Sequence, residues 1–433
     1  MLRCPPKGSL RLRPGKPAPP PWLVWSPVMH GNGWIPLGMG AHLYDLSPTL
    51  RLMIMGAVVA LGPLVWIWAR HQNAPTTRRL RVLTLVTLFM TFDLVIFGAF
   101  TRLTDSGLGC PDWPGCYGNA SPVGAELQIN AAQSAMPTGP VTHSKAWIEM
   151  IHRYLATGVG VLILTLTLLT WVALREERRR AKSENGGVRT IVSFWWPCVT
   201  LLWVCLQGIF GALTVTMKLF PAIVTLHLLG GMALLALLRA QSVIQAQINE
   251  NSKAAIVSIG MRRFVIVGFA LLWLQIALGG WVSTNYAVLA CSDFPACQNS
   301  FWPAMDFSQG FALWRELGAG NEGANISFQA LTAIHYAHRL AAYLLFVVLM
   351  VLAGRMQRVP ALRAQAGWLA GLTMLQVATG LSNVVLGWPL IGAVAHTGGA
   401  AALVVVLTGI VFSSRGMPVE VRVAKLGSAR LSV

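Results

Sequence analysis

Residues 149–174 read EMIHRYLATGVGVLILTLTLLTWVAL, an apolar run that opens with a carboxylate, an imidazole and a guanidinium. A helix needs about 20 apolar residues to cross a bilayer, and the run from Tyr154 onward meets that length. The side chains of Glu149, His152 and Arg153 are costly at such a depth, and ionisable groups inside a span mark a functional site by default. The stretch therefore predicts a transmembrane helix with a functional site near one end.

The composition of the whole chain is that of a polytopic membrane protein. Of its 433 residues, 55% are hydrophobic and only 11% are charged, whereas soluble domains carry about 25% charged residues. The net charge of +18 lies mostly in short loops, where it encodes membrane topology. We therefore do not expect nucleic-acid binding. Nine apolar segments are long enough to span: 52–69, 82–101, 146–174, 191–215, 221–243, 264–284, 329–354, 364–386 and 389–413.

Lysine and arginine alternate between the loops. Loop 175–190 carries six of them, whereas the two long loops 102–145 and 285–328 are nearly devoid of both. The positive-inside rule predicts that the basic loops and the C-terminus are cytoplasmic and that the two long loops face outward. We expect a multi-pass protein of the bacterial inner membrane. Segment 52–69 is the least secure span, because nine spans place a basic N-terminus outside.

These observations predict an all-α polytopic membrane protein with six regions. Its centre is two parallel-repeat four-helix bundles, eight core spans in all, preceded by one extra N-terminal span. The regions are a disordered Pro-rich extension (1–51), the extra span with a basic cytoplasmic loop (52–81), the first bundle (82–243), a cytoplasmic linker (244–263), the second bundle (264–413) and a cytoplasmic tail (414–433).

The two bundles share five features in the same order. Each has a long outer loop with a C-x5-C pattern, then a second span that opens with two polar residues followed by an arginine. Each third span has a Leu-Gln pair, and each fourth span has a histidine twenty residues after that glutamine, followed by a glycine pair. Because both halves enter the membrane from the same side, an axis near the membrane normal relates them. The residues are Cys110, Cys116, Glu149, His152, Arg153, Gln207, His227, Gly230 and Gly231, then Cys291, Cys297, His335, His338, Arg339, Gln376, His396, Gly398 and Gly399.

The paired cysteines lie in the two outward loops. An oxidising compartment favours disulfides, so we expect Cys110–Cys116 and Cys291–Cys297 bridges. Free thiols are the alternative. A zinc site is disfavoured because it needs two further ligands, and no suitable histidine is near in these loops.

Four histidines inside spans occupy matched positions, about 10–13 Å below the outer boundary at 1.5 Å per residue. They are His152, His227, His338 and His396. Within each half the two come from the second and fourth helices, which can face each other across a bundle core. A haem iron takes one imidazole nitrogen on each side. A lone histidine could as well bond a backbone carbonyl, but four in a repeated pattern favour two haem sites.

The halves differ beside these histidines. Glu149 lies one turn from His152, whereas its counterpart in the second half is His335. A carboxylate at a reacting centre can move protons or stabilise positive charge, so one haem is expected to be a reactant and the other an electron carrier. An ion pair with Arg153, four residues on, is the alternative role for Glu149. We expect Arg153 and Arg339 to meet haem propionates, because arginine pairs with carboxylates.

The stretches TRLTDSGLGCPDWPGC (101–116), EMIHRY (149–154), LHLLGG (226–231), IHYAHR (334–339) and AHTGG (395–399) resemble the haem A synthase family over residues 82–413. The resemblance implies oxidation of a methyl group of haem O, arriving from the lipid bilayer, to the formyl group of haem A for cytochrome c oxidase. It implies that His152 and His227 bind the substrate haem, that His338 and His396 bind a retained haem b, and that Glu149 is catalytic.

The resemblance also bears on the remaining parts of the site and on partners. Thr101, Arg102 and Ser106 are expected at the rim of the first pocket. Haem O synthase is the implied supplier of substrate, the electron donor is not identified, and homo-oligomerisation stays open. Two rivals are a dihaem electron-transfer cytochrome, which leaves Glu149 unexplained, and a haem transporter, which usually has broken helices near the midplane.

Overall fold

The computed structural model describes residues 47–183, 194–249, 252–320 and 325–417. The predicted cytoplasmic tail lies almost wholly outside these residues, as does most of the predicted disordered extension. Residues 47–51, which were predicted to belong to that extension, are already part of helix Ser47–Arg70. The helix therefore begins before the predicted boundary.

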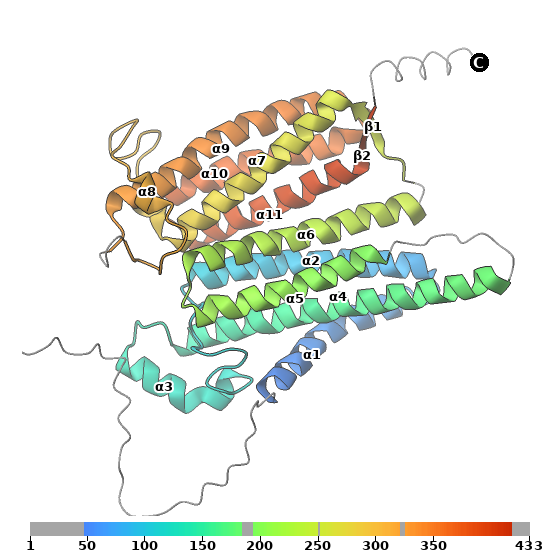
Figure 1. Ribbon diagram of the computed structural model, residues 1–433, viewed down its shortest axis with the longest axis horizontal. Coiled ribbons are helices and arrows are strands. Elements are labelled where there is room, and N and C mark those ends of the chain that lie inside the picture. Colours follow the sequence, from blue (N-terminus) through green and yellow to red (C-terminus); the bar gives the residue numbers. More distant parts are fainter. Residues whose placement is uncertain (1–46, 184–193, 250–251, 321–324, 418–433) are drawn as a thin grey trace, which may run out of the picture. The chain divides into compact units, whose positions relative to one another are not determined.

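The described residues contain nine helices that are long and apolar enough to cross a membrane. They coincide with the nine predicted spans, which are thereby confirmed. Even the least secure segment forms a helix, although Pro63 lies inside it. Figure 1 shows the nine helices, which are α1 (Ser47–Arg70), α2 (Thr76–Leu103), α4 (His143–Ser183), α5 (Trp195–Thr216), α6 (Pro221–Asn249), α7 (Ile259–Thr284), α9 (Phe328–Met356), α10 (Arg363–Val385) and α11 (Leu390–Ser413).

Two four-helix arrangements follow one another along the chain. In the first, α2 and α5 each pack against both α4 and α6, so α4 and α6 lie diagonally across the bundle (Figure 1). In the second, α7 and α10 each pack against both α9 and α11, which are therefore the diagonal pair. Helices α6 and α11 join the bundles, and one cluster of buried apolar side chains extends through both. This packing places each pair of matched histidines on diagonal helices.

Helix α1 lies outside this eight-helix core, against α4. Gly56 of α1 approaches Thr157 so closely that a Cβ at position 56 would lie 2.4 Å from the threonine methyl group. Small residues let two transmembrane helices approach in this way. The extra helix is thus packed on the first bundle through backbone proximity.

We call the end of the bundles that carries the two cysteine loops the outer end, and the opposite end the inner end. At the outer end Arg102 joins the two halves, donating to the Tyr286 hydroxyl at 2.9 Å and to the Ser283 carbonyl at 2.7 Å. The Tyr286 hydroxyl in turn donates to Asp105 at 2.6 Å. Asp105 and Tyr286 are separated by the same interval as Cys110 and Cys291, so they are repeat equivalents that meet at the axis between the halves.

The inner end contains a feature that the sequence analysis missed. Residues predicted as linker and tail form two short parallel strands, β1 (Ala255–Ser258) and β2 (Ser414–Met417). Val257 is buried, and β-branched residues favour strands. Ser258 ends β1 and caps α7 by accepting a hydrogen bond from the Met261 amide at 3.1 Å. The pair fixes the start of α7 beside the end of α11.

The outer loops also contain short helices. They are the 3₁₀ turn η1 (Pro122–Ala125) and α3 (Glu126–Ala135) after α2, with η2 (Ala287–Ala290) and α8 (Phe307–Gly310) after α7. A further 3₁₀ turn, η4 (Pro360–Leu362), precedes α10 at the inner end.

Candidate functional site

The second bundle brings two of the predicted histidines face to face. His338 of α9 and His396 of α11 have ring centres 6.5 Å apart, with an angle of 79° between the ring planes. An iron bonded to one nitrogen of each ring, at about 2 Å per bond, requires a separation of roughly 6 Å between the ring centres. The two rings could therefore hold a haem iron between them. In the first bundle His152 of α4 and His227 of α6 occupy the equivalent diagonal helices.

Each histidine ring packs against a glycine of a neighbouring helix. An added Cβ on that glycine would lie 2.9–3.4 Å from the ring Cε1, closer than the 3.5–4.0 Å at which carbon atoms normally pack. The sequence analysis missed these glycines, although their spacing repeats: one precedes the first loop cysteine by twelve residues in each half, and one follows the third-span glutamine by four. The pairs are Gly98–His152, Gly211–His227, Gly279–His338 and Gly380–His396.

The polar surroundings of the histidines differ between the halves. In the second bundle Thr379 Oγ1 lies 2.9 Å from His396 Nδ1, and Gln275 Nε2 lies 3.0 Å from His338 Nδ1. In the first bundle the Nδ1 atoms of His152 and His227 are buried and have no hydrogen-bond partner among the described residues. Outer partners fix the orientation of a metal-binding imidazole. Among the described residues, polar side chains contact the ring nitrogens in the second pair, whereas in the first pair the ring of Phe97 stacks on His152, with ring centres 6.3 Å apart.

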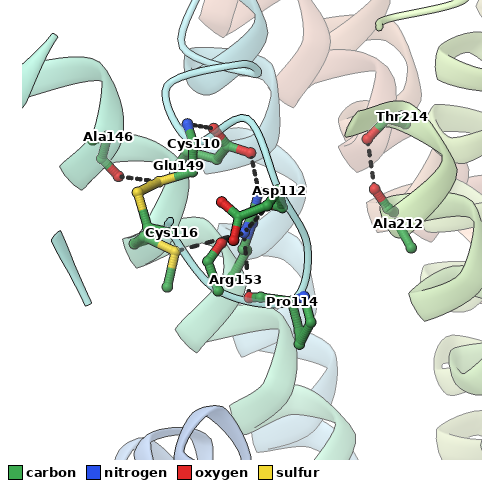
Figure 2. A network of polar contacts seen from close by, with 12 residues as sticks. Cys110, Asp112, Pro114, Cys116, Ala146, Glu149, Arg153, Ala212 and Thr214 are labelled. Carbon is green, nitrogen blue, oxygen red and sulfur yellow. Dashed lines mark hydrogen bonds and ion pairs between the residues drawn. A yellow bond between two sulfur atoms is a disulfide. The ribbon is translucent and has the colours of Figure 1, made fainter. Parts of the chain in front are cut away.

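Glu149 is buried beneath the first cysteine loop (Figure 2). One of its carboxylate oxygens forms an ion pair with Arg153. The other accepts a hydrogen bond from the Cys110 amide at 2.8 Å. The ion pair that the sequence left open as an alternative is thus present, and it ties the start of α4 to the loop.

The two arginines hold the cysteine loops. Arg153 donates to the backbone carbonyls of Asp112, Pro114 and Gly115, the first at 3.1 Å (Figure 2). Arg339 makes the same contacts in the second half, at 3.0 Å to the Asp293 carbonyl and 2.7 Å to that of Ala296. Their expected contact with haem propionates stays a prediction. The contacts present in the structure give these guanidinium groups a structural role that sequence reasoning missed.

His335 replaces Glu149 in the second half. Its Nδ1 lies 3.0 Å from the Ala287 carbonyl oxygen, and its Nε2 lies 3.4 Å from the Arg339 guanidinium. The same helix position therefore supports a loop through an imidazole in one half and through a carboxylate in the other. The sequence difference between the halves, Glu149 in one and His335 in the other, therefore lies beside equivalent cysteine loops.

Both predicted disulfides, Cys110–Cys116 and Cys291–Cys297, form in the structure. An aspartate inside each ring braces the following turn. Asp293 accepts hydrogen bonds from the Gln298 and Asn299 amides at 2.8 and 2.9 Å. The Asn299 amide is the main reason that the pKa of the Asp293 carboxyl is lowered from its usual value. Asp112 accepts equivalent hydrogen bonds from the amides of Tyr117 and Gly118.

The residues expected at the rim of the first pocket have other partners. Arg102 joins the two halves as described above. The Thr101 hydroxyl donates to the Phe97 carbonyl of its own helix at 2.9 Å, and Ser106 is fully buried with its hydroxyl 2.8 Å from that of Thr104. All three residues brace the end of α2.

Comparison with known proteins adds to this geometry. The family model for cytochrome oxidase assembly proteins matches residues 81–408, which include all but the first residues of α2 and the last residues of α11 in the two bundles. The haem A synthase of Shewanella oneidensis is 36% identical over 332 residues, which cover 75% of this chain and 93% of that protein. The haem A synthase of Caulobacter vibrioides is 27% identical over 352 residues, with the same two coverages.

The haem A synthase of Halalkalibacterium halodurans is 26% identical over 326 residues, 74% of this chain and 91% of that protein. These three matches cover more than nine tenths of each relative, and the residues matched by the family model include all four matched histidines. The chain therefore belongs to the COX15-CtaA family of cytochrome oxidase assembly proteins.

Proposed function

We propose that this protein is a haem A synthase, an integral membrane enzyme that oxidises a methyl group of haem O to the formyl group of haem A. The relatives that match over 74–75% of the chain carry that name. The structural observation that carries the proposal is the pair of matched histidines in each bundle, set on diagonal helices and packed against glycines. The rival cytochrome and transporter functions have no such support from the relatives.

The first bundle is the proposed substrate site, with haem O held between His152 and His227. Among the described residues no polar group bonds the Nδ1 atoms of these two histidines, which supports an exchangeable occupant, because a metal-binding imidazole is normally held by such an outer partner. The second bundle is the proposed site of a retained haem b, held by His338 and His396. The 6.5 Å ring separation and the neighbouring Thr379 support this assignment. A haem b bound there would supply one-electron transfer.

Glu149 is the proposed catalytic carboxylate. It lies three residues before His152 on the same helix, hence on the same face. The Cys110 amide and Arg153 fix the orientation of the carboxylate. In this position Glu149 can take a proton from the reacting carbon or stabilise positive charge that develops near it. The loop disulfide then acts indirectly, by holding the amide that orients the carboxylate.

The setting of the enzyme follows from the same proposal. Basic residues gather in the loops of the inner end, including Arg78, Arg79, Arg355 and Arg358, which supports a cytoplasmic inner end and C-terminus in a bacterial inner membrane. Haem O synthase is the proposed supplier of the substrate. An electron donor is a further proposed partner. Homo-oligomerisation stays a prediction.

The experiment is to purify the protein from cells that make haem O and to separate its extracted haems by chromatography. The proposal predicts haem A, or a hydroxylated precursor, together with haem b. Haem b alone, from cells shown to contain haem O, would support the dihaem electron-transfer cytochrome instead.

A further inference from the structure

Seven buried polar residues line the inner half of the first bundle, and each is at most 2% exposed. Because they come from all four helices of the bundle, they surround a common core rather than mark one helix. We call them the inner polar column: Thr84, Thr87, Thr91, Thr170, Thr200, Gln241 and Gln245.

Helical spacing places the column directly beneath the first histidine pair. Gln241 and Gln245 follow His227 by fourteen and eighteen residues, about four and five turns, so they share its face. Thr170 follows His152 by the same eighteen residues. The other threonines precede the histidine-facing glycines by seven to fourteen residues, also on the same faces. At 1.5 Å per residue the column extends from roughly 10 to 27 Å below the histidines, towards the inner end.

The second bundle lacks this lining. Equivalent positions in the two halves follow from three residue intervals: between the loop cysteines, between the second-span arginines and between the third-span glutamines. By these intervals, six of the seven column positions correspond to apolar residues or glycine in the second bundle. Thr373, which matches Val204, and Ser414, which matches Gln245, are the polar exceptions. Since the two bundles otherwise correspond, the polarity belongs to the half that contains Glu149. The six counterparts are Val265, Gly268, Leu272, Met356, Leu369 and Ile410.

Gln241 is the decisive member of the column. It is fully buried, and neither its amide nitrogen nor its amide oxygen has a hydrogen-bond partner among the described residues. Gln245 donates to the Thr84 hydroxyl at 3.1 Å, but its own amide oxygen is also without such a partner. Leaving a buried polar group unbonded is unfavourable, and such groups are normally satisfied by ordered water.

The threonines of the column can bind the same water. Their hydroxyls donate to the carbonyl four residues earlier, at 2.9 Å for Thr84, 2.8 Å for Thr87 and 2.7 Å for Thr91. Back-bonding of this kind uses the hydroxyl proton and leaves the oxygen free to accept. Buried threonines with this bond are ordinary in membrane helices. Only together with Gln241 and with the apolar counterpart bundle do they indicate a hydrated core.

The inner end of the column meets a carboxylate. Glu177 follows Thr170 by seven residues, about two turns of α4, and its Oε2 atom is buried without a hydrogen-bond partner among the described residues. At the other end, the disulfide loop that Arg153 holds covers the start of α4. Buried polar side chains therefore extend from the inner end of the bundle towards the histidine pair.

The chemistry of the proposed function requires such a route. If a redox acceptor takes the electrons, oxidation of the methyl group follows R–CH₃ + H₂O → R–CHO + 4H⁺ + 4e⁻, and four protons leave the site. If oxygen is the oxidant and an external donor supplies electrons, two hydroxylations follow R–CH₃ + 2O₂ + 4e⁻ + 4H⁺ → R–CHO + 3H₂O, and four protons enter. Either way protons must cross between a membrane-buried site and water. We propose that the inner polar column is a hydrated proton path between the His152–His227 site and the inner aqueous side, with Gln241 as its central water-binding residue. This inference rests on the proposed function.

The path is not an open channel. Leu234 and Leu238 lie on the same face of α6 between His227 and Gln241, and both are buried. Over this stretch the polar surface is supplied from α2 by Thr87 and Thr91. We therefore expect a few ordered waters rather than a bulk-filled pore.

The test has a structural arm and a kinetic arm. A map of the haem-loaded enzyme in lipid, at a resolution that shows ordered water, is expected to place water on the Gln241 amide, and a dry Gln241 overturns the proposal. Gln241→Leu is expected to slow haem A formation by about tenfold or more and to change the solvent deuterium isotope effect, while haem content and absorption spectrum stay those of the parent. An unchanged rate and isotope effect in this variant also overturn the proposal.

Two further variants separate the path from folding effects. Thr373→Val removes a buried hydroxyl from the second bundle and is expected to leave the isotope effect unchanged. If Gln241→Leu does not fold, Thr84→Val removes the partner of Gln245 with almost no change in volume and is expected to show the same kinetic change. If the parent enzyme produces no oxidised haem, the proposed function fails, and the water at Gln241 alone then decides whether the column is hydrated.

Discussion

Replacing Gly279 by alanine is expected to displace His338, a proposed haem ligand, without unfolding the helix. The new Cβ would lie 2.9 Å from His338 Cε1. Carbon atoms pack at 3.5–4.0 Å, so the ring or helix α7 must move by about 0.6 Å or more. Metal–ligand distances hold to within about 0.2 Å. Alanine also favours a helix over glycine by about 1 kcal/mol, so global stability is not expected to fall.

The expected loss of haem affinity follows from how far each histidine ring must move. Disturbing the groups that orient a metal ligand typically costs 10- to 100-fold in affinity, and we expect Gly279→Ala to weaken haem b binding by about that factor. Gly380 lies on the other side of the same site, where the Cβ would be 3.2 Å from His396 Cε1, so Gly380→Ala is expected to have a smaller effect. In the first bundle Gly98→Ala should weaken binding more than Gly211→Ala, at 3.0 against 3.4 Å.

The assay is the rate and extent of haem transfer from the purified protein to an excess of apomyoglobin, followed by absorption. Gly371→Ala is the matched control, because this glycine is on α10 with Gly380 but an added Cβ would meet no other described element within 4 Å. If Gly279→Ala retained haem as well as Gly371→Ala, the close packing of glycine and histidine would not be what positions the ligands, and the reasoning would be refuted.

Three further predictions concern the loops and their supports. Glu149→Gln is expected to accumulate haem O or a hydroxylated intermediate, because the carboxylate charge is lost while the shape is kept; a normal haem A yield by chromatography would remove Glu149 from the mechanism. Arg339→Gln leaves the loop carbonyls of the second half without their charged donor, and we expect a loss of about 3 kcal/mol, seen as a lower midpoint of thermal unfolding; an unchanged midpoint would contradict the support role. Because hydrogen bonds lower the pKa of Asp293, its contribution to loop stability is present above the unfolded pKa of about 4 and lost as pH falls through the folded value; amide exchange at Gln298 and Asn299 should accelerate below that pH, and Asp293→Asn should remove this dependence.

The spans and disulfides could be predicted because their signals are local. A run of about 20 apolar residues has few alternatives in a membrane protein, and the loop charges assign both cysteine pairs to one side. The diagonal placement of His338 and His396 also followed, since the order of four antiparallel helices constrains which of them face each other.

Other parts of the site depend on contacts that no spacing reveals. Arg153 and Arg339 were expected to meet propionates, but a guanidinium binds carbonyl oxygens as readily, and only the folded loop shows which acceptors are near. Strands β1 and β2 lie more than 150 residues apart in sequence, so their pairing is invisible to a local reading.

The structure adds a packing role to one member of each glycine pair. Both third-span glutamines approach the glycine three residues after the histidine, Gly230 in one half and Gly399 in the other. These two glycines are therefore the equivalent members of the pairs, and their close contact with the glutamines could not be read from the sequence.

The most direct test of the account is the haem content of His152→Ala and His338→Ala, purified in parallel from cells that make both haem b and haem O. The account predicts that His338→Ala loses haem b, and that His152→Ala keeps haem b but contains no haem O, haem A or hydroxylated precursor. Loss of haem b from His152→Ala, with haem b retained by His338→Ala, would contradict the assignment of the two bundles.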